Sequence, residues 1–313
     1  MSVFVGGPGL RCEVQPDRGA RIVSLQGEGG WEWLAASERT PSTGTGLPFV
    51  RPGMGGWDEV APTVQADQDA EAPAGTPLPD HGDVWNIPWR VDRAGPGELA
   101  VSVALPSMPV ALSRTITATG QGLRFHYRAT STSRAPLPLL WCAHPQFAAG
   151  PGVDVALESG GVRIAPELTE MYPGEGKDFD FAARPRHATM PAGTSLKAFI
   201  APETRADAAV LSLPTGRSLR LDWDSTQLPY LGLFWDNGEF AAEPVLAVEP
   251  STGWGERLSA AARQQRVLAV SQGQHLEWEL HLSETAVSVP KFGAPRQRAQ
   301  FWRASLPTTS SRG

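Results

Sequence analysis

Hydrophobic and polar residues alternate along most of the chain, with a period close to two. Strict alternation over four to eight residues is typical of a half-buried β-strand, because successive side chains point to opposite faces. In the clearest run, HLEWELHLS at 275–283, three leucines and one tryptophan share one face, while two histidines and two glutamates share the other. The pattern recurs at 20–27, 98–105, 112–119, 122–130, 153–159, 208–215, 217–223, 245–250, 266–272 and 275–283.

Glycine and proline separate these runs. The chain has 33 glycines and 29 prolines, spread throughout, which disfavours long helices and favours turns between short strands. Only 255–266 reads as a short helix of about two turns. Many short strands at regular spacing predict an all-β fold, a large β-sandwich of mostly antiparallel strands with few short helices.

The same kind of strand occurs from one end of the chain to the other, so we expect a single domain over 1–313 with its core at about 15–285. The polar, Pro- and Gly-rich stretch 64–80 is expected to be a surface loop, and 306–313 a disordered tail. One β domain of this length implies two large sheets, and a cleft on one of them.

Charge and composition exclude several classes of protein. The net charge is −6 with no basic block, which argues against nucleic acid or an anionic membrane surface as the main partner. No signal peptide and no stretch of 18 apolar residues is present, so a cytoplasmic protein is expected. The two cysteines have no metal-ligand spacing; a site of His81, His144 and a carboxylate is conceivable, but no motif supports it. We therefore expect no cofactor and no metal.

Four stretches interrupt the alternation with polar residues, at 48–63, 79–89, 139–147 and 230–256. Each polar residue has an ordinary structural explanation. A histidine in an apolar strand is usually a satisfied core residue, and WDNG at 235–238 fits an Asn-Gly turn. A glutamate ending the apolar run VLAVEP needs a reason if it is buried. The candidates in these stretches are Arg51, His81, His144, Asp236 and Glu249.

Tryptophans accompany these candidates. The chain has 11 tryptophans and only 3 tyrosines. A flat indole face beside His, Arg, Asp and Glu suits a pyranose ring, which stacks on aromatic rings and hydrogen-bonds to planar charged groups. Six lie near the polar candidates, namely Trp57, Trp85, Trp89, Trp141, Trp235 and Trp254, and the remaining five, Trp31, Trp33, Trp223, Trp278 and Trp302, are expected in the core.

Taken in order, the four stretches resemble the galactose mutarotase-like superfamily, which contains the aldose 1-epimerases. LPDHG and WCAHPQF resemble the two histidine motifs of that family, and VEPSTG resembles its catalytic-glutamate motif. Ala143 departs from the asparagine that usually precedes the second histidine, and GWDEVAPT is more acidic than the usual segment. The resemblance implies a β-supersandwich with its site in a cleft on one sheet.

The resemblance also implies a function, the interconversion of the α and β anomers of an aldose by general acid–base catalysis. Glu249 would be the base and His144 the acid, with a carboxylate neighbour keeping His144 protonated. The expected partner is a monosaccharide or sugar-containing small molecule, and the protein is expected to be a monomer or homodimer. Substrate-binding residues would be His81, Arg51 and Asp236, with stacking from Trp57, Trp141 or Trp254.

Two other functions remain open from the sequence. The same fold could serve as a non-catalytic carbohydrate-binding or regulatory module. A glycoside hydrolase or lyase could use a carboxylate pair, Asp58 or Glu59 together with Glu249. A phosphorylated sugar would need additional cations, for which Arg184, Arg186 and Lys197 are available.

Overall fold

The protein is built from two nine-stranded sheets. The computed structural model describes residues 1–7, 9–37, 44, 47, 49, 54–69, 77–150, 152–173 and 190–286. Neighbouring strands within both sheets are antiparallel. The prediction of an all-β sandwich is therefore confirmed.

The first sheet has the order β1 (Val3–Gly6), β2 (Arg11–Gln15), β3 (Arg21–Gln26), β4 (Gly56–Val60), β10 (Cys142–Ala148), β18 (Val245–Ser251), β17 (Tyr230–Asn237), β14 (Thr194–Ile200) and β13 (Leu168–Pro173). The second has the order β12 (Val162–Ile164), β11 (Asp154–Ser159), β15 (Ala208–Ser212), β16 (Arg217–Trp223), β20 (His275–Ala286), β8 (Gly122–Ser131), β7 (Val110–Ala118), β6 (Glu98–Ala104) and β5 (Arg90–Gly95). A small pair joins β9 (Leu137–Pro138) to β19 (Ala269–Val270). The short helices are η1 (Glu28–Gly30) and α1 (Leu258–Arg263).

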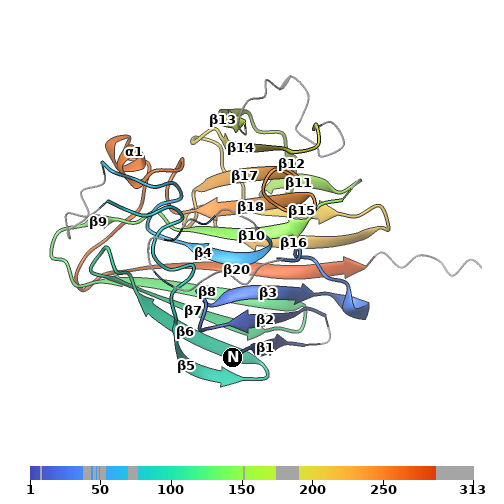
Figure 1. Cartoon of the computed structure of the whole chain (residues 1–313), viewed down its shortest axis with the longest axis horizontal. Helices are drawn as coiled ribbons and strands as arrows, with labels where there is room; N and C mark the ends of the chain where they lie inside the picture. Colours follow the sequence, from blue (N-terminus) through green and yellow to red (C-terminus); the bar gives the residue numbers. More distant parts are fainter. Residues whose placement is uncertain are drawn as a thin grey trace, which may run out of the picture.

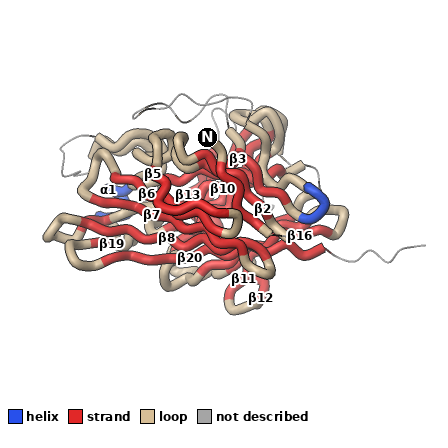
Figure 2. The backbone as a smooth tube through the Cα atoms, turned by 90° about the horizontal axis from the view of Figure 1, so that it is seen from below, coloured by secondary structure: helices blue, strands red, loops and turns tan. Residues whose placement is uncertain are grey.

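The two sheets form two layers, and the edge strands of one layer lie near the edge strands of the other. In Figure 1, β13 and β12 lie at one end, and β1 and β5 lie at the other. Seen from below in Figure 2, β10 of the first sheet lies above β20 of the second. The apolar core fills the space between the two layers.

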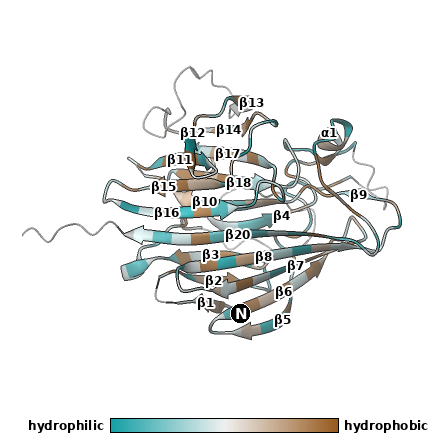
Figure 3. Cartoon of the chain, turned by 180° about the vertical axis from the view of Figure 1, so that it is seen from behind, coloured by the Kyte–Doolittle hydropathy of each residue, from teal (hydrophilic) through white to brown (hydrophobic). Residues whose placement is uncertain are grey.

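Alternation along the strands determines which side chains enter this core. Along β20, Trp278, Leu280 and Leu282 are buried, and His275, Glu277 and His281 are exposed or half-buried, as the sequence predicts. Figure 3 shows hydrophobic and hydrophilic residues alternating along the strands of the second sheet. Among the tryptophans expected in the core, Trp33, Trp223 and Trp278 are buried, but Trp31 is 43% exposed. Trp31 directly follows η1, and Trp302 lies outside the described residues.

A polar cluster lies inside the core and connects the two sheets. The carboxylate of Glu59 on β4 accepts hydrogen bonds from Arg114 Nη1 at 2.7 Å and from Tyr127 Oη at 2.9 Å, both on the second sheet. Its other oxygen accepts one from Trp141 Nε1 at 2.9 Å. A buried charge is stable only when it is paired and hydrogen-bonded, and Glu59 satisfies both conditions.

The ends of the predicted loop 64–80 are less exposed than expected. Val64 and Leu78 are buried, and Asp67 accepts hydrogen bonds from the backbone and hydroxyl of Ser259 at 2.7 and 2.9 Å. These contacts attach the loop ends to α1. Residues 70–76 and the predicted tail 306–313 lie outside the described residues. In the described part of the chain, no helix is long and apolar enough to span a membrane.

Replacing Arg114 with alanine should lower the free energy of unfolding by about 3–5 kcal/mol, because Glu59 would stay buried without its charge partner. Urea unfolding followed by tryptophan fluorescence measures this change. The control is Arg124→Ala on the outer face of β8, whose ion pair with Glu279 spans 3.7 Å. Exposed pairs contribute about 1 kcal/mol or less, so equal effects of the two substitutions would contradict the proposed role of the cluster.

Candidate functional site

Three of the central strands of the first sheet bring Asp58, His144 and Glu249 into one row. His144 on β10 pairs directly with Asp58 on β4. The pairs Cys142–Ser251 and Gln146–Ala247 place His144 opposite Glu249 on β18. Residues directly opposite each other in a sheet share a face. This row lies on the face turned away from the second sheet, since the alternate residues Trp57, Glu59 and Ala143 are buried in the core between the sheets.

Glu249 lies at one end of this row. It is only 1% exposed. Its Oε2 accepts a hydrogen bond from Lys197 Nζ on β14, and its Oε1 lies 3.6 Å from His144 Nε2. Among the residues that the structure describes, Oε1 has no hydrogen-bond partner. The two oxygens of this carboxylate therefore have different surroundings, since only Oε2 is held by a cation.

Lys197 is a site residue that the sequence analysis did not connect to Glu249. Burial alone lowers the pKa of a lysine, but the adjacent Glu249 carboxylate more than offsets this and raises the pKa of Lys197. Lys197 is therefore an ammonium ion. The available signal was its position inside the short apolar run SLKAFI, where a lone charge requires a buried partner.

Gly232 provides the room for this ion pair. It lies opposite Glu249 on β17, and Phe199 lies beyond it on β14. A Cβ at Gly232 would come within 3.2 Å of Glu249 Oε2 and 3.5 Å of Lys197 Cε. A glycine here lets the lysine reach across one strand to the carboxylate.

The expectation that His144 is held protonated by its carboxylate neighbour is wrong. Burial, together with repulsion from the basic side chains of His81, Lys197 and Arg21, lowers the pKa of His144 well below its usual value. The charge of Glu249 is already matched by Lys197, so it does not stabilise a second cation. His144 is therefore a neutral imidazole near pH 7.

His81 approaches the same place from the loop after Leu78. Its Nδ1 donates to Asp80 Oδ1 at 3.0 Å. Its ring stacks on Phe49 with centroids 3.7 Å apart, and lies 5.4 Å from the ring of His144. The structure thus brings His81, His144 and Glu249 together, as the sequence predicts. Arg51 lies outside the described residues.

His81, His144 and Lys197 line a cavity of about 200 Å³, and Glu249 lies directly behind His144 and Lys197. This volume is below the roughly 300–1,000 Å³ of drug-sized ligand sites, so it suits a small ligand. Its walls combine aromatic rings with acidic and basic groups. The lining residues are Phe49, Met54, Val64, Gln65, Asp80, His81, His144, Lys197, Phe234, Phe240 and Glu256.

The predicted stacking tryptophans do not line this cavity. Trp57 stacks on Phe125 in the core, at 5.0 Å between ring centroids, and Trp141 donates to Glu59. Trp57 precedes Asp58 on a strand, so it must face the opposite side. Trp254 is buried and donates to the carbonyl of Ile200. Phenylalanines supply the aromatic surface instead, at positions 49, 234 and 240.

Asp236 also has a different role from the one expected. It is fully buried, and its carboxylate accepts the backbone N–H groups of Gly238, Glu239 and Phe240 at 2.6, 3.0 and 2.8 Å. These bonds form the turn that the WDNG sequence allows. Asp236 therefore holds the turn that carries Phe240, a residue of the cavity wall, and its substrate-binding role stays a prediction.

The position of Glu59 bears on the hydrolase hypothesis. Its place in the core removes it from any carboxylate pair with Glu249. Asp58 does share the face of Glu249, but the His144 strand separates the two. Asp58 is buried beside Arg21, whose Nε lies 3.5 Å from Asp58 Oδ1.

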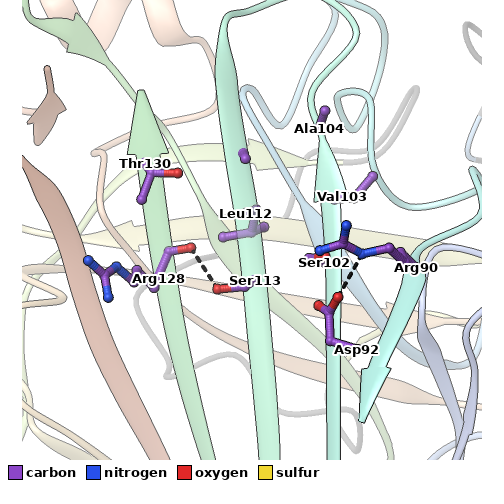
Figure 4. Close-up of a pocket in the computed structure, with 10 residues that line it drawn as sticks. Arg90, Asp92, Ser102, Val103, Ala104, Leu112, Ser113, Arg128 and Thr130 are labelled. Carbon is purple, nitrogen blue, oxygen red and sulfur yellow. Dashed lines mark hydrogen bonds and ion pairs between the residues drawn. The ribbon is translucent and has the colours of Figure 1, made fainter. Parts of the chain in front are cut away.

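A second concavity lies on the outer face of the second sheet (Figure 4), with a volume of about 470 Å³. It is formed by β5 to β8, and small side chains such as Ser102, Ala104 and Ser113 line it. Its arginines are already engaged: Arg90 pairs with Asp92 at 2.6 Å, and Arg128 contacts His275 at 3.2 Å. The first cavity, with its buried acid and base groups, is therefore the better candidate site.

An NMR titration should show His144 taking up its proton below about pH 6.5, the usual value for histidine. The unfolded chain then binds this proton more readily than the folded chain. The stability contributed by neutral His144 should be fully present above about pH 6.5 and lost as the pH falls toward the folded-state pKa. Urea unfolding at several pH values should show that acidification lowers the free energy of unfolding less in His144→Asn than in the wild type. Protonation of His144 at or above pH 6.5 would contradict this assignment.

Comparison with known proteins gives matches in structure only. No family model matches the sequence, and no curated protein matches it. A galactose mutarotase-like protein from Lactobacillus casei superposes with a TM-score of 0.68 at 19% identity, over 91% of this chain and 100% of that one.

Two further solved structures agree with this match. A candidate aldose 1-epimerase from Escherichia coli K12 has a TM-score of 0.64 at 13% identity, over 92% of this chain and 99% of its own. A galactose mutarotase related enzyme from Lactobacillus acidophilus has a TM-score of 0.61 at 11% identity, over 91% and 98%. The chain therefore has the galactose mutarotase-like fold, as the order of its motifs predicts.

Proposed function

We propose that the protein is an isomerase that interconverts the α and β anomers of an aldose. The observation that carries this proposal is the pair of atoms at the centre of the site. Glu249 Oε1 has no hydrogen-bond partner within the described part of the chain and lies 3.6 Å from His144 Nε2. Two atoms at this distance can contact two oxygens that are bonded to the same carbon. The anomeric hydroxyl and the ring oxygen of a cyclic hemiacetal have this arrangement.

In this reaction Glu249 is the general base. Its Oε1 removes the proton of the anomeric hydroxyl while the bond between C1 and the ring oxygen breaks. Lys197 holds Oε2 and supplies the positive charge that balances the buried carboxylate. The product of this step is the open-chain aldehyde.

His144 is the general acid: its neutral imidazole gives a ring proton to the ring oxygen as that bond breaks and becomes an imidazolate, whose negative charge replaces the one that Glu249 loses on taking up a proton. A neutral imidazole can act as the electrophilic partner in such sites. Rotation about C1–C2 then presents the other face of the carbonyl. On reclosure, the ring hydroxyl returns its proton to His144, and Glu249 returns its proton to the carbonyl oxygen. Both groups recover their starting protonation states, and no cofactor is consumed.

The aromatic and polar walls of the cavity support a monosaccharide substrate. A sugar presents C–H faces that pack on rings such as Phe49, Phe234 and Phe240, and hydroxyls that bond to His81 and Glu256. A single hexose is consistent with the small volume. Lys197 is committed to Glu249, so it is not a free cation for a phosphate group. We therefore favour a neutral sugar.

Glu249→Gln should lower kcat/KM for mutarotation by about 10²–10⁴-fold, because an amide cannot accept the proton. The measurement is polarimetry or NMR of freshly dissolved α-anomers, over a panel of free and phosphorylated hexoses. Glu277→Gln, on the outer face of the second sheet, is the control and should keep wild-type activity. Full activity in Glu249→Gln would refute the assignment. Sugar binding without faster equilibration by the wild type would instead indicate a binding module.

A further inference from the structure

Gln146 lies directly beside His144 in the site. It follows His144 by two residues on β10, so both side chains are on the same face. Gln146 is fully buried. Its partner across the ladder is Gly56, which has no side chain and a φ of +73°. A Cβ at Gly56 would come within 2.8 Å of the carbonyl oxygen of Ile22 and 2.9 Å of Arg21 Nε, so a glycine is needed at this point of β4.

The backbone fixes which way this amide points. The N–H of Gly55 donates to Gln146 Oε1 at 2.6 Å. A backbone N–H can only donate, so it requires the oxygen end of the amide. The alternative orientation would place two donors against each other, and this excludes a flipped amide. The NH₂ end therefore faces the other way, where Nε2 lies 3.4 Å from His144 Nδ1.

We propose that Gln146 is a positioning residue that holds His144 in the tautomer with its hydrogen on Nε2. An amide NH₂ can only donate, so the Nδ1 that it faces must be the acceptor. In a neutral imidazole with an accepting Nδ1, the hydrogen is on Nε2. That nitrogen is the one directed at Glu249 Oε1, 3.6 Å away. The contacts from Gly55 to Gln146 and from Gln146 to His144 thus determine that the ring hydrogen of His144 lies on Nε2.

The other states of His144 are disfavoured by the same contacts. A hydrogen on Nδ1 would meet the NH₂ of Gln146 and would turn a lone pair of Nε2 toward the Glu249 carboxylate. Double protonation would place a hydrogen on Nδ1 as well, which agrees with the lowered pKa of His144. The catalytic consequence rests on the proposed function: only the tautomer with Nε2–H can deliver a proton to the ring oxygen. The tautomer itself follows from the geometry alone.

The full-length wild-type protein, labelled with ¹⁵N-histidine, tests this directly. Two-bond ¹H–¹⁵N correlation spectra distinguish a ring nitrogen that carries hydrogen from one that carries a lone pair, and His144→Asn assigns the signals. At neutral pH we expect a protonated Nε2 and an unprotonated Nδ1 at His144. A protonated Nδ1 in the wild type would overturn the proposal without any variant.

Gln146→Glu is the matched variant. It has nearly the same shape and still offers an oxygen to Gly55 N–H, but it replaces the NH₂ with a second acceptor. His144 should then carry hydrogen on Nδ1, and kcat should fall by at least about tenfold, since the wrong tautomer of a catalytic histidine can cost about 10⁴-fold. An unchanged tautomer in Gln146→Glu would overturn the proposal.

Two readouts separate this inference from the proposed function. If the wild type has the Nε2–H tautomer but does not accelerate mutarotation, the tautomer assignment stands and the proposed function fails. If it accelerates mutarotation but has hydrogen on Nδ1, the function stands and Gln146 does not have this role. Gln146→Met, which lacks both contacts, should show a mixture of tautomers, and the wild-type pattern in this variant would also overturn the proposal.

Discussion

The hydrogen bonds to the carboxylate of Glu59 connect the two sheets at one point in the core. Apolar packing between two sheets tolerates small shifts, whereas a buried carboxylate bonded to Arg114, Tyr127 and Trp141 does not, because each lost bond leaves a polar group unpaired. This cluster fixes the position of β4. The rest of the site follows from that strand, since Asp58 pairs with His144, and His144 lies opposite Glu249.

On the other face of the first sheet, the charges of neighbouring groups determine which side chains carry a proton. Lys197 and Glu249 form a closed ion pair in a buried place, where an isolated charge would be costly. The pair leaves His144 uncharged, with Gln146 on one ring nitrogen and Glu249 near the other. The base and the acid of the proposed reaction therefore differ in charge before a ligand binds.

The fold could be predicted from the sequence because alternation reports directly on half-buried strands, as in β20. His81, His144 and Glu249 could be predicted because each belongs to a motif. Lys197 could not, since its partner is 52 residues away and β17 separates their strands. Nearness in sequence to a polar residue does not give the direction of a tryptophan: Trp57 and Asp58 are adjacent on a strand and point to opposite faces, and Trp141, just before β10, donates to Glu59 in the core. The turn sequence after Asp236 explains its hydrogen bonds, and its substrate-binding role stays a prediction.

The neighbouring carboxylates Asp58 and Glu59 show how strongly the site depends on strand register. One faces the cavity side and the other faces the core, and only the pleat of β4 separates their roles. A one-residue slip would exchange them, since every side chain of a strand changes face together. Loss of one residue from Gly56–Val60 would therefore remove the core anchor and alter the site in the same event. We infer that this segment has a nearly fixed length, although the surface loops around it can vary.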